Sequence, residues 1–225
     1  MSVSVIIKNI KRVYIIRKLY MNLSCNLLNL KYILWGNNKF INRGCAKFKK
    51  DIIGSNNIVE VSIDSVIHSA QILIRGNNNK IYFGERVYCG PRCSFRIEAN
   101  NASIFVGSST TFTRDVQLCV QEDEMNISLG KDCMLSNNII IRTSDSHPIF
   151  NELGERINHA NSVQIGDHVW IAPNSKIMKG VLIGNGTIVG SNTMVTKQLP
   201  SNVLAVGAPA KVIKENVRWT REKLY

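Results

Sequence analysis

The chain has 225 residues, of which 44% are apolar and 20% are charged, and its formal net charge is +12. This length supports one large domain, and the composition excludes an intrinsically disordered chain. No apolar run approaches the length of about 20 residues that a bilayer-spanning helix needs, and early basic residues interrupt any signal-peptide-like core. We therefore predict one soluble protein in the cytoplasm, with contact to the inner face of the membrane as a further expectation.

Positive charge is concentrated in residues 1–50, which hold eleven lysines and arginines and no acidic residue. Val3, Ile7, Ile10 and Tyr14 recur at helical spacing among these charges, which predicts a basic, partly helical N-terminal segment. Such a segment can bind anionic lipid, acidic polysaccharide or nucleic acid, or it is a solvated face that caps the end of the fold. We expect peripheral membrane contact through it and no nucleic-acid partner.

A six-residue repeat organises residues 51–213, the predicted main domain. An apolar residue recurs at this spacing from Ile165 to Val195, and the same frame returns in three earlier triplets. The fifteen positions are Phe83, Cys89, Phe95, Val106, Phe112, Leu118, Leu129, Leu135, Ile141, Ile165, Ile171, Ile177, Ile183, Val189 and Val195. Six residues form one short strand and a corner, so three repeats close a triangular coil that stacks on the coil before it.

The repeat predicts an all-β protein, a parallel β-helix with coils at 81–98, 104–121, 127–144, 163–180 and 181–198. An irregular coil precedes them near residues 59–74. Residues 145–162 interrupt the repeat as an inserted loop, and residues 214–225 are expected to form a short C-terminal helix. Gly, Asn and Asp follow many of the apolar positions, which suits corners where the backbone takes unusual φ angles.

The cysteines contain no Cys-x-x-Cys pair and stand among apolar residues, which predicts reduced thiols in the core of a cytoplasmic protein. The six are Cys25, Cys45, Cys89, Cys93, Cys119 and Cys133.

Three segments resemble a known family. They are Thr143-Ser144-Asp145-Ser146-His147-Pro148-Ile149, then Ile165-Gly166-Asp167-His168-Val169-Trp170-Ile171, then Val195-Thr196-Lys197 with the later run Val206-Gly207-Ala208-Pro209-Ala210-Lys211-Val212-Ile213. In these segments the chain resembles the hexapeptide-repeat O-acetyltransferases, especially those that modify capsule or lipopolysaccharide sugars. The resemblance covers roughly residues 104–214.

The resemblance implies a left-handed parallel β-helix that assembles as a homotrimer, with active sites between neighbouring subunits. It further implies acetyl-coenzyme A as the acyl donor and a carbohydrate hydroxyl as the acceptor, in a capsule, lipopolysaccharide or other surface glycan. The basic N-terminal segment favours an acceptor that is acidic or lipid-linked.

His147 matches the family's catalytic histidine and is the expected general base. An alcohol attacks a thioester poorly unless its proton leaves as the new bond forms, and a neutral imidazole suits that task near pH 7. Asp145 is expected to orient the imidazole, a role that a backbone carbonyl fills equally well. Without the resemblance, His147 reads as a solvated histidine of a loop.

The resemblance also implies a donor-binding set on the last coils: Trp170, Ala172, Ser191, Thr196, Lys197, Lys211 and Lys214. Trp170 packs beside the coenzyme or the acceptor, or else covers a seam between subunits. Lys211 and Lys214 match basic positions near the coenzyme phosphates, although ordinary surface lysines are the alternative. Pro173 has no N–H and cannot donate to an oxyanion, so the oxyanion donor stays unassigned.

Three residues are candidates for acceptor binding. Arg156 in the inserted loop suits a sugar hydroxyl or carboxylate, or it pins the loop. Asp115 and Gln117 are alternatives for a polar acceptor contact on the second coil.

Rival functions remain open at this point. The same architecture carries gamma-type carbonic anhydrases, but no His-x4-His pair occurs, and we predict no metal site. N-acetylation of an amino sugar nucleotide needs the same base and differs only in the attacking atom. A non-catalytic trimeric scaffold that binds a polyanion is the third alternative.

Overall fold

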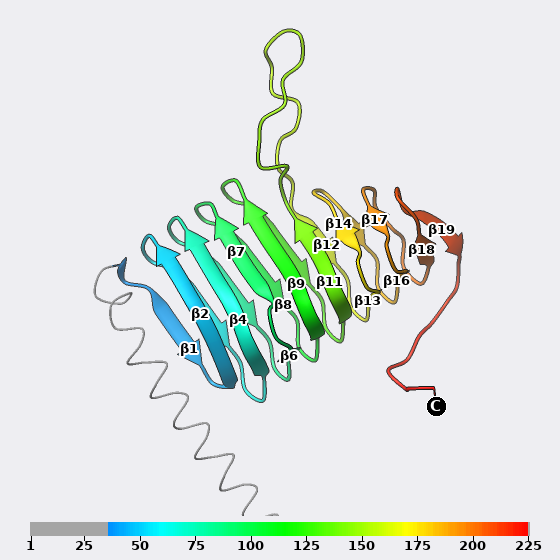
Figure 1. The fold of residues 1–225 in the computed structure, drawn as a ribbon, viewed down its shortest axis with the longest axis horizontal. Coiled ribbons are helices and arrows are strands. Elements are labelled where there is room, and N and C mark those ends of the chain that lie inside the picture. The colour runs from blue at the N-terminus through cyan, green and yellow to red at the C-terminus, as the bar shows by residue number, and fades with distance from the viewer. Residues whose placement is uncertain (1–35, 225) are drawn as a thin grey trace, which may run out of the picture.

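The computed structural model describes residues 36–224, and the predicted basic helix and Cys25 lie outside them. The described residues form a parallel β-helix, in which each coil stacks on the next from β1 to β18 (Figure 1). Strands of successive coils pair in parallel and build one sheet of seven strands and one of twelve. The predicted β-helix is therefore confirmed.

The seven-stranded sheet contains β1 (Lys39–Asn42), β3 (Ile58–Val61), β5 (Lys80–Phe83), β8 (Ser103–Val106), β10 (Asn126–Leu129), β12 (Val163–Ile165) and β15 (Leu182–Ile183). The twelve-stranded sheet contains β2 (Cys45–Ile53), β4 (Val66–Arg75), β6 (Tyr88–Cys89), β7 (Ser94–Glu98), β9 (Thr111–Gln121), β11 (Met134–Arg142), β13 (Trp170–Ile171), β14 (Lys176–Ile177), β16 (Ile188–Val189), β17 (Met194–Val195), β18 (Leu204–Val206) and β19 (Lys211–Lys214).

The coil has three sides because the long strands of the second sheet turn a corner. Asp115 in β9 and Asn138 in β11 have φ angles of 55° and 56°, in the left-handed region that Asn and Asp tolerate better than most residues. Beyond the corner the later coils supply separate strands: β13 pairs with the first part of β11, and β14 pairs with its last part. One strand of the first sheet and the two parts of a bent strand thus make one triangular turn.

The apolar frame forms the core. All fifteen repeat positions are at most 3% exposed, so the period that was read from the sequence marks the inward-facing residues. Aromatic rings from successive coils pack edge to face in the core, with Phe95 edge-on to Phe83 and to Phe112 at centroid distances of 4.7 and 5.8 Å. The five described cysteines are free, and four of them are buried.

The β-helix starts earlier than residue 51, because β1 and β2 already pair with the following coil. In β2, exposed Lys47 and Lys49 alternate with less exposed Ala46 and Phe48, as expected of a strand with one face towards solvent. The lysines of the outer face make this alternation difficult to recognise in the sequence. Residues 39–50, which the sequence predicted as part of a basic N-terminal segment, therefore belong to the first coil of the β-helix.

The expected C-terminal helix is absent. Lys211–Lys214 form β19, antiparallel to β18, and residues 215–224 contain no helix. This segment is held by tertiary contacts: Trp219 stacks on His168 with ring centroids 4.0 Å apart, and its Nε1 donates to the carbonyl of His168. These contacts fix the segment without helical hydrogen bonds.

The inserted loop stands out from the β-helix as a long arm (Figure 1). At its base the outgoing and returning limbs of the arm pair with each other: the amide of Ile157 donates to the carbonyl of Ile149, and Phe150 forms an antiparallel β-bridge with Arg156. Among residues 36–224, no helix is long and apolar enough to cross a bilayer.

Candidate active site

His147 lies where the chain leaves the third predicted coil. After β11 ends at Arg142, the buried residue Thr143 still belongs to the β-helix: its hydroxyl accepts from the amide of Gln121 and donates to the carbonyl of Gln121, both at 3.0 Å. The chain then turns outward, and His147 is exposed. The histidine is therefore presented within a few residues of a rigid strand end.

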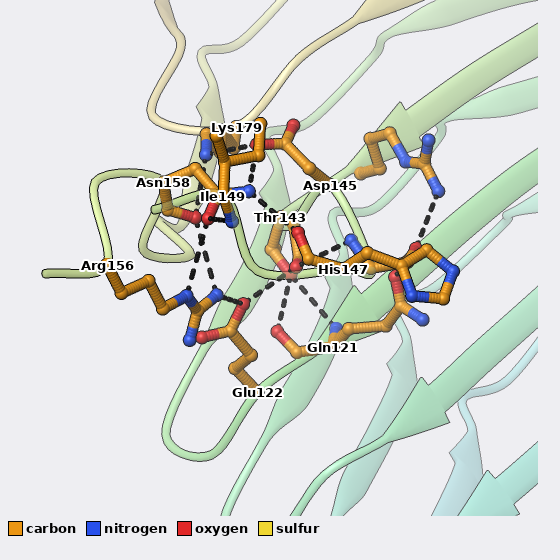
Figure 2. Close-up of polar contacts among 12 residues, drawn as sticks. Gln121, Glu122, Thr143, Asp145, His147, Ile149, Arg156, Asn158 and Lys179 are labelled. Carbon is orange, nitrogen blue, oxygen red and sulfur yellow. Dashed lines mark hydrogen bonds and ion pairs between the residues drawn. The ribbon is translucent and has the colours of Figure 1, made fainter. Parts of the chain in front are cut away.

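Asn158 holds the backbone of His147 from the returning limb of the arm (Figure 2). It is 7% exposed, and its side-chain amide donates to the carbonyl of His147 at 2.8 Å and to the carboxylate of Asp145 at 3.0 Å. Its side-chain carbonyl accepts from the amide of Ile149 at 2.7 Å. One buried side chain thus fixes the chain on both sides of the histidine.

Two ion pairs flank Asn158. Lys179 reaches the carboxylate of Asp145 at 2.5 Å and the carbonyl of Asn158 at 3.0 Å. On the other side, Arg156 bonds the carboxylate of Glu122 at 2.6 Å. Hydrogen bonds from Lys179 hold the pKa of Asp145 below its ordinary value, and those from Arg156 lower the pKa of Glu122 to about 2. Both carboxylates are therefore ionised at neutral pH.

The structure does not place Asp145 against the imidazole. Its carboxylate is taken up by Lys179 and Asn158, and in Figure 2 the ring of His147 points away from that cluster. Among residues 36–224, no group hydrogen-bonds the ring. Asp145 therefore anchors the segment that carries His147, and the expected role as orienter of the ring has no contact to support it within one chain.

Acid should release the Glu122–Arg156 pair. The pKa of Glu122 is depressed from an ordinary value of 4.5 to about 2, so its stabilising contribution is present above about pH 4.5 and is lost as the pH falls towards 2. We expect the unfolding free energy of the wild type, measured in urea, to fall more steeply than that of Glu122→Gln across this window. Arg156→Gln should flatten the curve in the same way. Parallel curves for wild type and Glu122→Gln would show that the pair does not form.

The expected donor-binding residues are distributed over two sides of the C-terminal coils, with Lys211 and Lys214 beside β18 and with Thr196 and Lys197 after β17. Ser191, Thr196, Lys197, Lys211 and Lys214 are exposed, and Ala172 is buried directly after β13. The three lysines have no acidic partner among residues 36–224. Their charge is therefore available to an anion such as a phosphate.

Trp170 projects from β13 and is half-buried. Its ring is tilted against that of Trp219, with centroids 5.9 Å apart, and its Nε1 is shielded from solvent without a partner in the described part of the chain. Trp219 thus joins Trp170 in an aromatic wall that the repeat pattern did not predict.

The acceptor-binding candidates separate into two kinds. Asp115 is bound by Arg92 through two bonds of 2.6 and 2.7 Å, which lower its pKa, and Arg156 is occupied by Glu122. Both residues thus serve the structure, and the alternative reading of Arg156 as a residue that pins the loop fits its contacts. Gln117 is exposed on β9, on the same side of the strand as Gln121 below His147.

Comparison with known proteins identifies the family to which the repeat belongs. The family model described as bacterial transferase hexapeptide (six repeats) matches residues 162–197. A polysialic acid O-acetyltransferase of Neisseria meningitidis is 37% identical over 193 residues, which cover 76% of this chain and 89% of that protein. This chain belongs to the hexapeptide-repeat O-acetyltransferases.

Two solved structures of similar fold support the assignment of this chain to the acetyltransferase family. The polySia-specific acetyltransferase NeuO has a TM-score of 0.72 at 31% identity, over 83% of this chain and 81% of that one. The polysialic acid O-acetyltransferase OatWY has a TM-score of 0.64 at 30% identity, over 84% and 90%. The β-helix is of the left-handed class that the resemblance implied, although parallel crossovers are normally right-handed.

Sequence reasoning missed three residues that shape the site of this acetyltransferase: Glu122, Asn158 and Lys179. Asn158 lies in the inserted loop, where no period marks it, and Lys179 occupies a corner where polar residues are common. The carbonyl of His147 is 11 positions from Asn158, and the ion-pair partners of Glu122 and Lys179 are each 34 positions away. Residues 36–224 hold no group of three His, Cys, Asp or Glu side chains that could bind a metal ion.

Proposed function

We propose that the protein transfers the acetyl group of acetyl-coenzyme A to a hydroxyl of an acidic surface glycan, with polysialic acid as the acceptor class. The observation that carries the proposal is His147, an exposed imidazole without a partner among residues 36–224, on a backbone held by Asn158 and an ion pair. The 37% identity to a polysialic acid O-acetyltransferase, over 89% of that protein, supports the acceptor.

His147 acts as the general base. Its neutral imidazole accepts the proton of the acceptor hydroxyl as the hydroxyl oxygen attacks, and a ring without a competing partner is free to receive it. Asn158 and Asp145 act on the backbone beneath the ring and keep it in one place. When bound, acetyl-coenzyme A supplies the activated thioester.

The C-terminal coils hold the donor. Lys197, Lys211 and Lys214 meet its phosphates, since they are exposed and have no ion-pair partner among residues 36–224. Ser191, Thr196 and Ala172 lie along the path of its pantetheine arm. Trp170 offers a flat surface to the donor or the acceptor.

A homotrimer completes this site. Trp170 pairs with Met134 on the side of the coil before the corner at Asn138, whereas His147 follows the strand beyond that corner. The two residues therefore lie on different sides of one chain, and in the proposed trimer a neighbouring copy brings its Trp170 towards His147.

The arm supports assembly with another copy. It carries a set of exposed large apolar side chains, and Leu153 and Ile157 are 82% and 61% exposed. The set comprises Ile149, Phe150, Leu153 and Ile157. Apolar side chains gathered on one projecting element are typical of a surface that another subunit covers.

We further propose that the enzyme acts in the cytoplasm, with peripheral contact to the membrane through the basic N-terminal residues. Free thiols in the described part and exposed Lys39, Arg43, Lys47 and Lys49 on the first coil support this location.

Mass spectrometry of oligosialic acid incubated with the purified protein and acetyl-coenzyme A tests the function. We expect a gain of one or more acetyl groups that mild base removes, since an ester is labile where an amide is not. A neutral glucan of the same length is the matched acceptor control and should stay unmodified. Base-stable acetylation would indicate N-acetyl transfer, and unmodified oligosialic acid would refute the acceptor class.

A further inference from the structure

Arg142 lies directly beneath the proposed catalytic loop. It is the last residue of β11, and its Nη2 donates to the hydroxyl of Ser146 at 3.1 Å. Ser146 precedes His147 in the chain and donates in turn to the side-chain carbonyl of Gln121 at 2.7 Å. The guanidinium group thus reaches the residue next to the imidazole.

The charge of Arg142 is not neutralised by an ion pair within residues 36–224. The other arginines around it are paired: Arg96 with Glu98 at 2.8 Å and Arg156 with Glu122 at 2.6 Å. The carboxylate of Asp145, the acidic group near His147, forms its ion pair with Lys179, and the charge of Arg142 acts on it from a longer distance without an ion pair. An arginine is always charged in a protein, so a half-buried one without a counterion favours an anion from outside the chain.

The Nε atom of Arg142 adds an independent observation. It is shielded from solvent and has no hydrogen-bond partner in the described part of the chain. A shielded N–H group without an acceptor is rare in native proteins and calls for an explanation. A carboxylate that bonded Nε would give this donor the charge-assisted acceptor that it lacks.

Arg142 belongs to a row of neighbouring residues that runs across the strands of the twelve-stranded sheet. Arg142 lies beside Cys119, and Cys119 lies beside Arg96 on β7. Two strand spacings separate the two arginines, which is roughly 10 Å. The positive charge is therefore stronger next to His147, where Arg142 has no ion pair within the described part of the chain, and weaker at Arg96, where Glu98 offsets it.

We infer that Arg142 binds the carboxylate of the acceptor sugar and so sets the enzyme's preference for acidic glycans. This inference rests on the proposed function, since it assumes that His147 receives a proton from a hydroxyl of the same sugar. A sialic acid unit carries one carboxylate and several hydroxyls, so a fixed carboxylate brings a hydroxyl of that unit or its neighbour to the imidazole. The planar guanidinium suits a carboxylate because two N–H groups can bond its two oxygens.

The test pairs a change in the protein with a matching change in the acceptor. Initial rates are measured for wild type, Arg142→Gln and Arg142→Lys with oligosialic acid and with the same glycan whose carboxylates are reduced to alcohols. For Arg142→Gln we expect KM for oligosialic acid to rise between about 10- and 100-fold, as for loss of a charged hydrogen bond, with KM for acetyl-coenzyme A retained. For Arg142→Lys, KM for oligosialic acid should lie between those of the wild type and Arg142→Gln. Lysine keeps the positive charge but lacks the two parallel N–H donors of the guanidinium group.

The carboxyl-reduced acceptor separates binding from folding. The wild type should show a similar rise in KM with it, and Arg142→Gln should add little further loss. The matched control is Arg86→Gln, because Arg86 is an exposed arginine on a distant corner. Its KM for both acceptors should equal that of the wild type. Thermal melting of each variant shows whether the fold is intact.

Two results would overturn the inference. If the wild type acetylates oligosialic acid and Arg142→Gln does so with an unchanged KM, Arg142 does not bind the acceptor, while the proposed function stands. If the wild type uses the carboxyl-reduced glycan as well as the native one, no carboxylate is recognised. Failure of the wild type to acetylate oligosialic acid at all would instead refute the acceptor class, and the inference with it.

Discussion

Replacement of His147 by alanine should lower kcat for acetyl transfer by between about 100- and 10,000-fold, which is the usual contribution of a general base. The side chain is exposed and makes no hydrogen bond within residues 36–224, so its removal should cost little stability. The measurement is the initial rate of free thiol release from acetyl-coenzyme A with oligosialic acid as acceptor. KM for acetyl-coenzyme A should stay near the wild-type value, because the donor-binding residues lie on other coils.

His159→Ala is the matched control. His159 is another exposed histidine of the same arm, and it lies next to Asn158 on the returning limb. We expect it to retain wild-type kcat. If His147→Ala keeps more than half of the wild-type rate, or if His159→Ala loses as much as His147→Ala, then His147 is not the base.

Replacement of Asn158 should have the second-largest effect. Asn158→Ala removes the donors to the carbonyl of His147 and to Asp145, as well as the acceptor for Ile149. A displacement of about 1 Å in a catalytic group can cost on the order of 100-fold in rate, so we expect kcat to fall by about that factor. KM for acetyl-coenzyme A should change little, because the substitution moves His147 and not the donor site.

Asn158→Asp separates positioning from general stability. It keeps an oxygen for the amide of Ile149 but loses the donor to His147 and sets a second negative charge beside Asp145. It should therefore impair kcat at least as much as Asn158→Ala. Asn151→Ala, which removes the pin at the tip of the arm, is the matched control and should leave kcat unchanged. A rise in KM for acetyl-coenzyme A with kcat preserved in either Asn158 variant would contradict the positioning role.

The local pattern of the chain predicted the β-helix because each coil repeats the same six-residue unit. Inward residues such as Phe95 and Ile171 recur at fixed spacing, and their burial needs no knowledge of distant segments. The inserted loop was visible as an interruption of that period. The resemblance then singled out His147 within it.

Patterns failed where the outer face or distant contacts decide the structure. Lys47 and Lys49 lie on the outer face of β2, so the first coil reads as a basic segment. The C-terminal residues follow no period, because contacts of Trp219 and Arg221 with His168 and Asp132 hold them.

The sequence by itself determined the stacked coil, its core and the place of the histidine, since a periodic chain specifies its own neighbours. Only the tertiary structure decided how His147 is held and what surrounds it. Glu122, Arg142 and Lys179 come from three separate coils and Asn158 from the inserted loop, and the hydrogen bonds of such residues depend on where the coils place them. For the same reason Asp145 contacts a lysine 34 positions away, and not the histidine two positions along the chain.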